Sequence, residues 1–259
     1  MSRVRRKHIP SERERARIWL CQSERGVWGH RRIRDSEPYG PPQMMAATQA
    51  PIIKMKRKGQ LFVVSAPSGT GKTTICREVL KRTPDLKLSV SYTTRPPRPA
   101  EKNGRDYFFI SEPKFRGMIQ QEAFAEWAQV HGHYYGTPKK ALLESLESGR
   151  NVLLNIDSQG AMQLKNSFPQ GVFVYLLPPS FKTLKTRLRE RASDPDEVIQ
   201  QRLEKATEEI RNYSAYSYLI VNDDLKKATD DLRAIIQAES LKIHLVDHAW
   251  VARTFHLNN

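Results

Sequence analysis

Short runs of apolar residues recur along the chain from Gly59 onward, and each has the length of a strand. They lack the apolar–polar alternation of half-exposed strands, which is typical of parallel strands covered on both faces. The runs are residues 61–64, 152–156 (interrupted only by Asn155), 172–177 and 218–221, with a further apolar stretch at 86–90. We expect them to form the parallel sheet of an α/β fold.

Between these runs, apolar residues recur at helical spacing. The expected helices are residues 73–82, which end near Pro84, a segment around 115–119, residues 181–188 with Ser180 as N-cap, residues 198–213, and residues 225–236. Alternation of strands and helices supports the α/β assignment. Residues 241–259 show no pattern that we can assign.

The net charge of the chain is +15, and most of it lies near the amino end. Residues 1–58 hold fifteen Lys and Arg against five Asp and Glu, a net charge of +10, and show little apolar periodicity. We therefore expect no packed core there. Residues 59–259 hold 28 against 23, a net charge of +5. That mild excess suits a protein that handles anionic phosphates better than one devoted to nucleic acid.

Two interpretations of residues 1–58 are open. They are either a basic arm that binds a polyanion such as RNA or a lipid surface weakly, or an extension that the working protein does not need. We favour the second, in which case Met44, Met45 and Met55 are candidate starts.

The chain has no apolar run long enough for a transmembrane helix and no apolar core of a secretory signal. Its two cysteines, Cys21 and Cys76, have neither disulfide nor metal spacing. These features predict a cytoplasmic protein.

Residues 61–74, LFVVSAPSGTGKTT, combine a strand, a glycine-rich loop and the start of a helix. This is the order of the phosphate-binding loop, G-x-x-x-x-G-K-[ST]. Its backbone N–H groups surround a polyphosphate, its lysine reaches the β- and γ-phosphates, and its hydroxyl holds Mg²⁺. Ala66 occupies the first glycine position, whereas Gly71, Lys72 and Thr73 match the pattern. The stretch predicts a nucleotide site.

Residues 91–109, SYTTRPPRPAEKNGRDYFF, bring Arg95, Arg98 and Arg105 together with several hydroxyls. Guanidinium groups bind phosphate oxygens through paired hydrogen bonds and keep their charge. Three prolines stiffen the backbone here, and Tyr107 could donate to the same anion. On charge alone, a solvated basic loop explains the segment equally well.

Glu126 and Asp157 are candidates for reading a purine base. A carboxylate can accept hydrogen bonds from guanine N1–H and its 2-amino group, a donor pair that adenine lacks. Taken alone, Glu126 would more simply be a surface residue, and Tyr135, in the sequence YYGT, a core residue.

Together these residues resemble guanylate kinase over about residues 59–238. The match includes the SAPSGTGKT loop, where bacterial members commonly carry alanine at the position of Ala66. It also includes the spacings of residues 93–109 and the sequences FAEWA, YYGT, NIDSQGA, RLRER and IVNDD. The resemblance implies a P-loop NTPase domain over residues 59–240 with a parallel-sheet core, an inserted GMP-binding subdomain near 91–140 and a helical lid near 186–202.

The resemblance also implies transfer of the γ-phosphoryl group of ATP to GMP, and to dGMP, with Mg²⁺ required. The implied ATP-binding residues are Ala66, Pro67, Ser68, Gly69, Thr70, Gly71, Lys72, Thr73, Thr74, Asn222 and Asp223, with Thr73 as the metal ligand. The implied GMP-binding residues are Ser91, Arg95, Arg98, Tyr107, Glu126, Tyr135, Thr137 and Asp157. The implied catalytic residues are Lys72, Arg187, Arg191 and Arg202.

The lid arginines also have a physical rationale. Arg187 and Arg191 are four residues apart and share a helix face. Phosphoryl transfer needs positive groups around the migrating phosphate and exclusion of water, and arginines on a closing lid supply both.

Asn155 departs from the family pattern, which usually has an acidic residue there. Such a carboxylate would orient Mg²⁺-bound water. We expect weaker Mg²⁺ dependence or a modestly lower rate.

Two alternatives to a GMP kinase are an inactive guanylate-kinase-like binding module and a P-loop kinase for another phosphate acceptor. Lys72, Thr73 and the lid arginines argue against the first, and Glu126 and Asp157 argue against the second. The sequence leaves the oligomeric state open.

Overall fold

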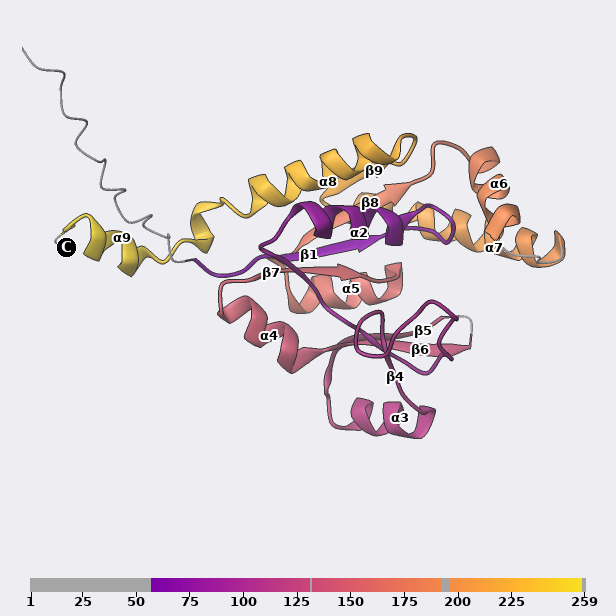
Figure 1. Cartoon of the computed structure of the whole chain (residues 1–259), viewed down its shortest axis with the longest axis horizontal. Helices are drawn as coiled ribbons and strands as arrows, with labels where there is room; N and C mark the ends of the chain where they lie inside the picture. Colours follow the sequence, from indigo (N-terminus) through magenta and orange to yellow (C-terminus); the bar gives the residue numbers. More distant parts are fainter. Residues whose placement is uncertain (1–56, 131, 192–195, 258–259) are drawn as a thin grey trace, which may run out of the picture. The chain divides into compact units, whose positions relative to one another are not determined.

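The computed structural model describes residues 57–130, 132–191 and 196–257 (Figure 1). The candidate starts, Cys21 and nearly all of the basic segment 1–58 lie outside the described residues. The described residues all belong to one compact unit.

Within the described residues, a five-stranded parallel sheet has the strand order β2-β7-β1-β8-β9. The strands are β1 (Leu61–Ser65), β2 (Leu86–Leu88), β7 (Asn151–Asn155), β8 (Val172–Leu177) and β9 (Tyr218–Val221). Each apolar run of the sequence therefore forms a strand, and the α/β prediction is confirmed. The loop 66–71 follows the central strand β1, and Asn155 pairs with Val64 at the same edge of the sheet.

Helices cover both faces of this sheet (Figure 1). The helices α2 (Lys72–Arg82) and α8 (Leu225–Glu239) pack on one face, and α4 (Lys139–Glu147) and α5 (Ser158–Ser167) on the other. On β1, Phe62 and Val64 belong to the first core, whereas Leu61 and Val63 belong to the second. Burial of both faces explains why β1 has no polar alternation.

A second, mixed sheet is inserted in the chain between β2 and β7. Its order is β4 (Phe108–Phe109), β3 (Tyr92–Thr93), β6 (His133–Pro138) and β5 (Phe124–Val130). The helix α3 (Glu112–Gln120) packs on it through Phe115, whose ring stacks on Phe124 at 4.5 Å and on Tyr134 at 5.4 Å between centroids. This small aromatic core gives the insertion a hydrophobic centre of its own.

The predicted lid region lies in α6 (Phe181–Arg191) and α7 (Asp196–Arg211), with residues 192–195 outside the described chain. Leu184 and Leu188 of α6 pack against Ile199 and Ala206 of α7. The predicted cap is present, because Ser180 Oγ accepts a hydrogen bond from Thr183 N at 3.1 Å.

The carboxyl end forms short elements that the sequence pattern did not reveal. The 3₁₀ helix η1 (Tyr213–Ala215) follows α7, and η2 (Ile243–Leu245) and the helix α9 (His248–Thr254) follow α8. Helix α9 buries none of its residues, and its sequence therefore lacks the apolar periodicity from which a helix can be predicted. No helix in the described ranges has both the length and the apolar character needed to cross a membrane.

Candidate active site

The loop between β1 and α2 depends on glycine at two positions. Gly69 (φ 89°) and Gly71 (φ 99°) adopt left-handed backbone conformations that side chains disfavour. A Cβ atom on Gly71 would also lie 2.6 Å from Asn222 Nδ2. Among described residues other than glycine, only Glu122 and His256 have positive φ. Ala66 therefore has a backbone conformation open to any residue, which explains why the first glycine of the motif is dispensable here.

Lys72 is the first residue of α2 and is half-buried. Its Nζ donates a hydrogen bond to the carbonyl oxygen of Ile156. Burial lowers the pKa of Lys72, and the nearby Asp157 carboxylate opposes that shift. The ammonium group lies at the N-terminus of a helix, where backbone N–H groups and the helix dipole also favour an anion.

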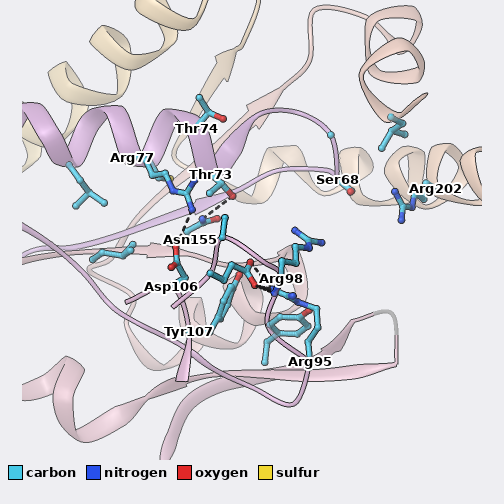
Figure 2. A pocket seen from close by; sticks show the side chains of 18 residues that line it. Ser68, Thr73, Thr74, Arg77, Arg95, Arg98, Asp106, Tyr107, Asn155 and Arg202 are labelled. Carbon is cyan, nitrogen blue, oxygen red and sulfur yellow. Dashed lines mark hydrogen bonds and ion pairs between the residues drawn. The ribbon is translucent and has the colours of Figure 1, made fainter. Parts of the chain in front are cut away.

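A cavity of about 770 Å³ lies between this loop and the inserted sheet (Figure 2). Ser68, Thr73 and Thr74 line one side, whereas Arg95, Arg98 and Tyr107 lie opposite them, and Arg202 of α7 lies at one end. The volume is within the range of nucleotide-sized pockets. Residues that are more than a hundred positions apart in the sequence thus face one space.

Glu101 organises the arginines of this cavity. Arg95 Nη2 donates to both carboxylate oxygens of Glu101 at 2.9 Å, and Arg98 N donates to Glu101 Oε2 at 2.9 Å. The Arg95 guanidinium also lies 5.5 Å from the centre of the Tyr107 ring. These contacts hold Arg95 in place before any ligand binds. Arg105 differs, since it is exposed and bonds Asp106 and Ala100.

A smaller cavity of about 200 Å³ adjoins the first and shares Thr73, Tyr107, Tyr135 and Asn155 with it. Its lining also includes Lys72, Ser91, Glu126 and Asp157. Thr137, another predicted GMP-binding residue, does not line this cavity. It is fully buried and contacts the lining residue Glu126. Tyr135, which taken alone suggested a core position, lines both cavities.

Glu126 is only 4% exposed, so the simpler interpretation of it as a surface residue is wrong. It lies in β5 opposite Thr137, whose Oγ1 donates to Glu126 Oε1 at 2.5 Å. Burial raises the pKa of Glu126 to about 7, the Thr137 hydrogen bond opposes the shift, and the Asp157 carboxylate adds to it.

Asp157 is the N-cap of α5. Its Oδ1 accepts hydrogen bonds from Gln159 N at 2.7 Å and Gly160 N at 3.1 Å. The cap fixes the carboxylate at the edge of the smaller cavity. Asp157 and Glu126 thus line one space from two different elements.

Arg187 joins helix α6, in the predicted lid region, to the phosphate-binding loop. Its guanidinium donates to the carbonyl oxygens of Thr70 and Asn222, both at 3.2 Å. The Asn222 amide is buried and donates to Thr70 O at 2.6 Å, so it braces the loop. Asp223 is exposed. The Arg191 side chain lies outside what the structure describes.

Thr73 and Asn155 form a pair that suits a magnesium site. Asn155 Nδ2 lies 3.4 Å from Thr73 Oγ1, and both side chains line the two cavities. The side chains supply a hydroxyl and an amide oxygen, which are hard ligands. Mg²⁺ in kinases typically takes one or two protein oxygens and completes its shell with phosphates and water. The residues present fit that ion.

Other contacts near the site could not be predicted from the sequence because they join distant segments. Arg77 of α2 forms an ion pair with Asp106 of the insertion at 3.1 Å, at the edge of the larger cavity (Figure 2). Gln163 of α5 bonds both backbone groups of Trp127 in β5. No local pattern signals either contact. Glu101, in contrast, lies within residues 93–109, whose spacings match the family, and could have been assigned a role.

A glycine loop at the carboxyl edge of a parallel sheet, facing arginines and a buried glutamate on an insertion, defines a P-loop kinase of small phosphorylated molecules. The family model described as guanylate kinase matches residues 58–239. The chain belongs to the guanylate kinase family.

Individual relatives agree with this assignment. The chain is 47% identical over 191 residues to a guanylate kinase of Caldanaerobacter subterraneus subsp. tengcongensis, covering 74% of this chain and 93% of that one. It is 51% identical over 191 residues to a guanylate kinase of Carboxydothermus hydrogenoformans, covering 74% and 94%. The crystal structure of guanylate kinase from Anaplasma phagocytophilum superposes with a TM-score of 0.65 at 30% identity, covering 79% of this chain and 99% of that one.

Proposed function

We propose that this protein is an ATP:GMP phosphotransferase, which gives GDP and ADP and recycles GMP in purine metabolism. The observation that carries the proposal is the adjacency of the two cavities. One contains the phosphate-binding loop and the Arg95 cluster, and the other contains the paired carboxyl groups of Glu126 and Asp157. A donor, an acceptor phosphate and a guanine base can therefore be held in one continuous site.

In this proposal the smaller cavity takes the guanine. Glu126 and Asp157 accept the N1–H and 2-amino hydrogens, and Thr137 holds the Glu126 carboxylate through its hydroxyl. Adenine presents neither hydrogen, so its binding would leave the buried Glu126 and the half-buried Asp157 without the donors that guanine supplies, which is costly. Arg95, Arg98 and Tyr107, with Ser91 and Tyr135, hold the GMP phosphate. The same contacts would accept dGMP.

The loop amides and Lys72 hold the ATP phosphates, for which Lys72 exchanges the carbonyl of Ile156 for phosphate oxygens. Bound Mg²⁺, held through Thr73 and Asn155, would neutralise charge between the β- and γ-phosphates. The GMP phosphate oxygen is already anionic and needs no general base. Arg187, Arg191 and Arg202 stabilise the transferred group from the lid and from α7. We assign Asn222 and Asp223 to the part of the site that takes the adenine of ATP.

A coupled assay for ADP release with GMP, AMP, CMP and UMP tests the function. We expect activity with GMP at least ~100-fold above that with the other three, since two hydrogen bonds to the base, one of them to the buried Glu126, discriminate. Activity with none of them would contradict the proposal and would favour a binding module or a kinase for another acceptor. Lys72→Ala should abolish turnover, whereas Lys140→Ala, on the exposed face of α4, should not.

We further propose that residues 59–240 are the catalytic domain, that residues 1–58 are dispensable for catalysis, and that the protein is cytoplasmic. Cys76, a buried free thiol, suits a reducing compartment. A variant lacking residues 1–44 should keep the kcat and both KM values of the full chain. Loss of activity, or of a measurable RNA affinity, would show that the segment has a role.

A further inference from the structure

Gly160 lies in the first turn of α5, where glycine has no conformational advantage. The φ angle of Gly160 is not positive, so the backbone does not require glycine at this position. Inside a helix, glycine is also less stabilising than alanine. Its surroundings supply a different reason. A Cβ atom at this position would lie 2.2 Å from Glu126 Oε2 and 3.0 Å from Glu126 Cδ. The buried carboxyl group of β5 therefore occupies the space that a side chain at residue 160 would take.

We propose that Gly160 is a specificity-determining position, at which the missing side chain lets the Glu126 carboxylate lie against the first turn of α5 beside Asp157. The inference rests on the proposed function, in which these two carboxyl groups read guanine. The same turn serves both groups, because Gly160 N donates to Asp157 Oδ1 while the Gly160 Cα faces Glu126 Oε2. Gly160 is a positioning residue and does not itself contact the base.

Gln163, one turn further along α5, limits how an added methyl group could be accommodated. Gln163 Nε2 donates to Trp127 O at 2.8 Å, and Trp127 N donates to Gln163 Oε1 at 3.2 Å. These two bonds tie the backbone of β5 to α5 at the residue after Glu126. The strand therefore resists moving away as a whole. The end of the Glu126 side chain is the part that can move, at the expense of its bond to Thr137.

The structure thus assigns a distinct effect to Gly160→Ala. The fold should survive, since the clash is relieved by the end of a flexible side chain. Recognition of the base should suffer, because the carboxylate is displaced from its hydrogen-bonding position. We expect the KM and Kd for GMP to rise about 10-fold or more, the size expected for losing a charged hydrogen bond. The KM for ATP should stay unchanged, and kcat should fall by less than about 3-fold.

Gly117→Ala is the matched control. Gly117 also lies inside a helix, α3, and a Cβ atom there would have no neighbour within 4 Å. Its KM and Kd values should equal those of the unmodified protein. Both variants are checked by circular dichroism and by thermal unfolding.

A second variant tests the contact itself. Glu126→Asp shortens the acidic side chain by one methylene group and makes room for the methyl of Gly160→Ala. The double variant should bind GMP more tightly than the product of the two single losses predicts. This comparison also keeps the inference testable if Gly160→Ala alone folds poorly, since the double variant should then recover folding.

Titration calorimetry with GMP, together with kinetics on GMP and AMP, separates the outcomes. A weaker Kd for GMP and at least a ~10-fold loss of GMP-over-AMP selectivity in Gly160→Ala support the inference. Unchanged GMP affinity and selectivity in Gly160→Ala would overturn it, while the proposed function would stand if the unmodified protein phosphorylates GMP. Strictly multiplicative losses in the double variant would also overturn it. Failure of the unmodified protein to bind GMP would overturn both.

Discussion

Replacing Glu126 by glutamine should stabilise the ligand-free protein while it weakens GMP binding. The carboxyl group is 4% exposed and lies near Asp157, and burial raises its pKa to about 7 from an ordinary value of 4.5. An ionised carboxylate is therefore costly at this position. Glutamine has nearly the same shape, and its amide oxygen can still accept the Thr137 hydroxyl hydrogen bond.

The size of the stabilisation follows from the pKa difference. Because the folded protein holds the Glu126 proton more tightly than the unfolded chain does, its stability falls as pH rises through the window from 4.5 to about 7. Each pKa unit corresponds to about 1.36 kcal/mol, so the loss reaches at most about 3 kcal/mol above pH 7. Glu126→Gln removes this loss. The variant should match the unmodified protein near pH 4.5 and exceed its unfolding free energy by up to about 3 kcal/mol at pH 8.

Urea unfolding at pH 5 and pH 8 measures this difference as a shift in the midpoint at constant slope. Glu144→Gln is the control, because the Glu144 side chain on α4 is 63% exposed and replacing an exposed side chain should change the unfolding free energy little. The same Glu126 variant should raise the KM for GMP by about 10- to 100-fold, since one guanine hydrogen would meet an amide N–H. A variant that is no more stable than the unmodified protein at pH 8 would refute the argument that burial opposes ionisation of Glu126.

Three further substitutions test other contacts. Glu101→Gln removes the charge that holds Arg95, so GMP binding should weaken about 10-fold while the affinity for ATP stays unchanged. Equal GMP affinity of the variant and the unmodified protein in calorimetry would contradict this. Arg77→Ala breaks an exposed ion pair with Asp106, so the free energy of unfolding should change by less than about 1 kcal/mol. The KM for GMP should rise only about 2- to 3-fold. In steady-state kinetics at high salt, this difference in KM between the variant and the unmodified protein should disappear. Asn155→Asp should raise kcat or Mg²⁺ affinity by restoring a carboxylate beside Thr73, and a magnesium titration without any change would reject that role.

Much of the fold could be predicted because its signals are local. The run at residues 172–177 forms β8 with those bounds, and Ser180 caps α6 as its position predicts. The resemblance makes Ala66 ordinary, and the backbone angles add the physical reason, since φ at this position is not positive and does not require glycine. The strand order could not be predicted, because β1 lies between strands that are about ninety and a hundred and ten residues further along the chain.

Some residues of the candidate site could likewise be predicted from the sequence, and others could not. Lys72, Thr73, Arg95 and Arg98 are recognisable from residue type and spacing, as their motifs are contiguous in the sequence. The environment of Glu126 is not recognisable, because a glutamate between small and aromatic residues has no sequence mark of burial.

The sequence by itself determined that this chain is an α/β protein with a phosphate-binding loop and an arginine-rich acceptor segment, because strand periodicity and loop chemistry act over a few neighbouring residues. Only the tertiary structure decided which carboxyl group is buried and how it is held. Glu126 meets Thr137 across a strand pair and meets Gly160 across 34 residues of chain, on a helix. Packing between separate elements sets such contacts, so the meaning of one helical glycine became visible only once the chain had been folded.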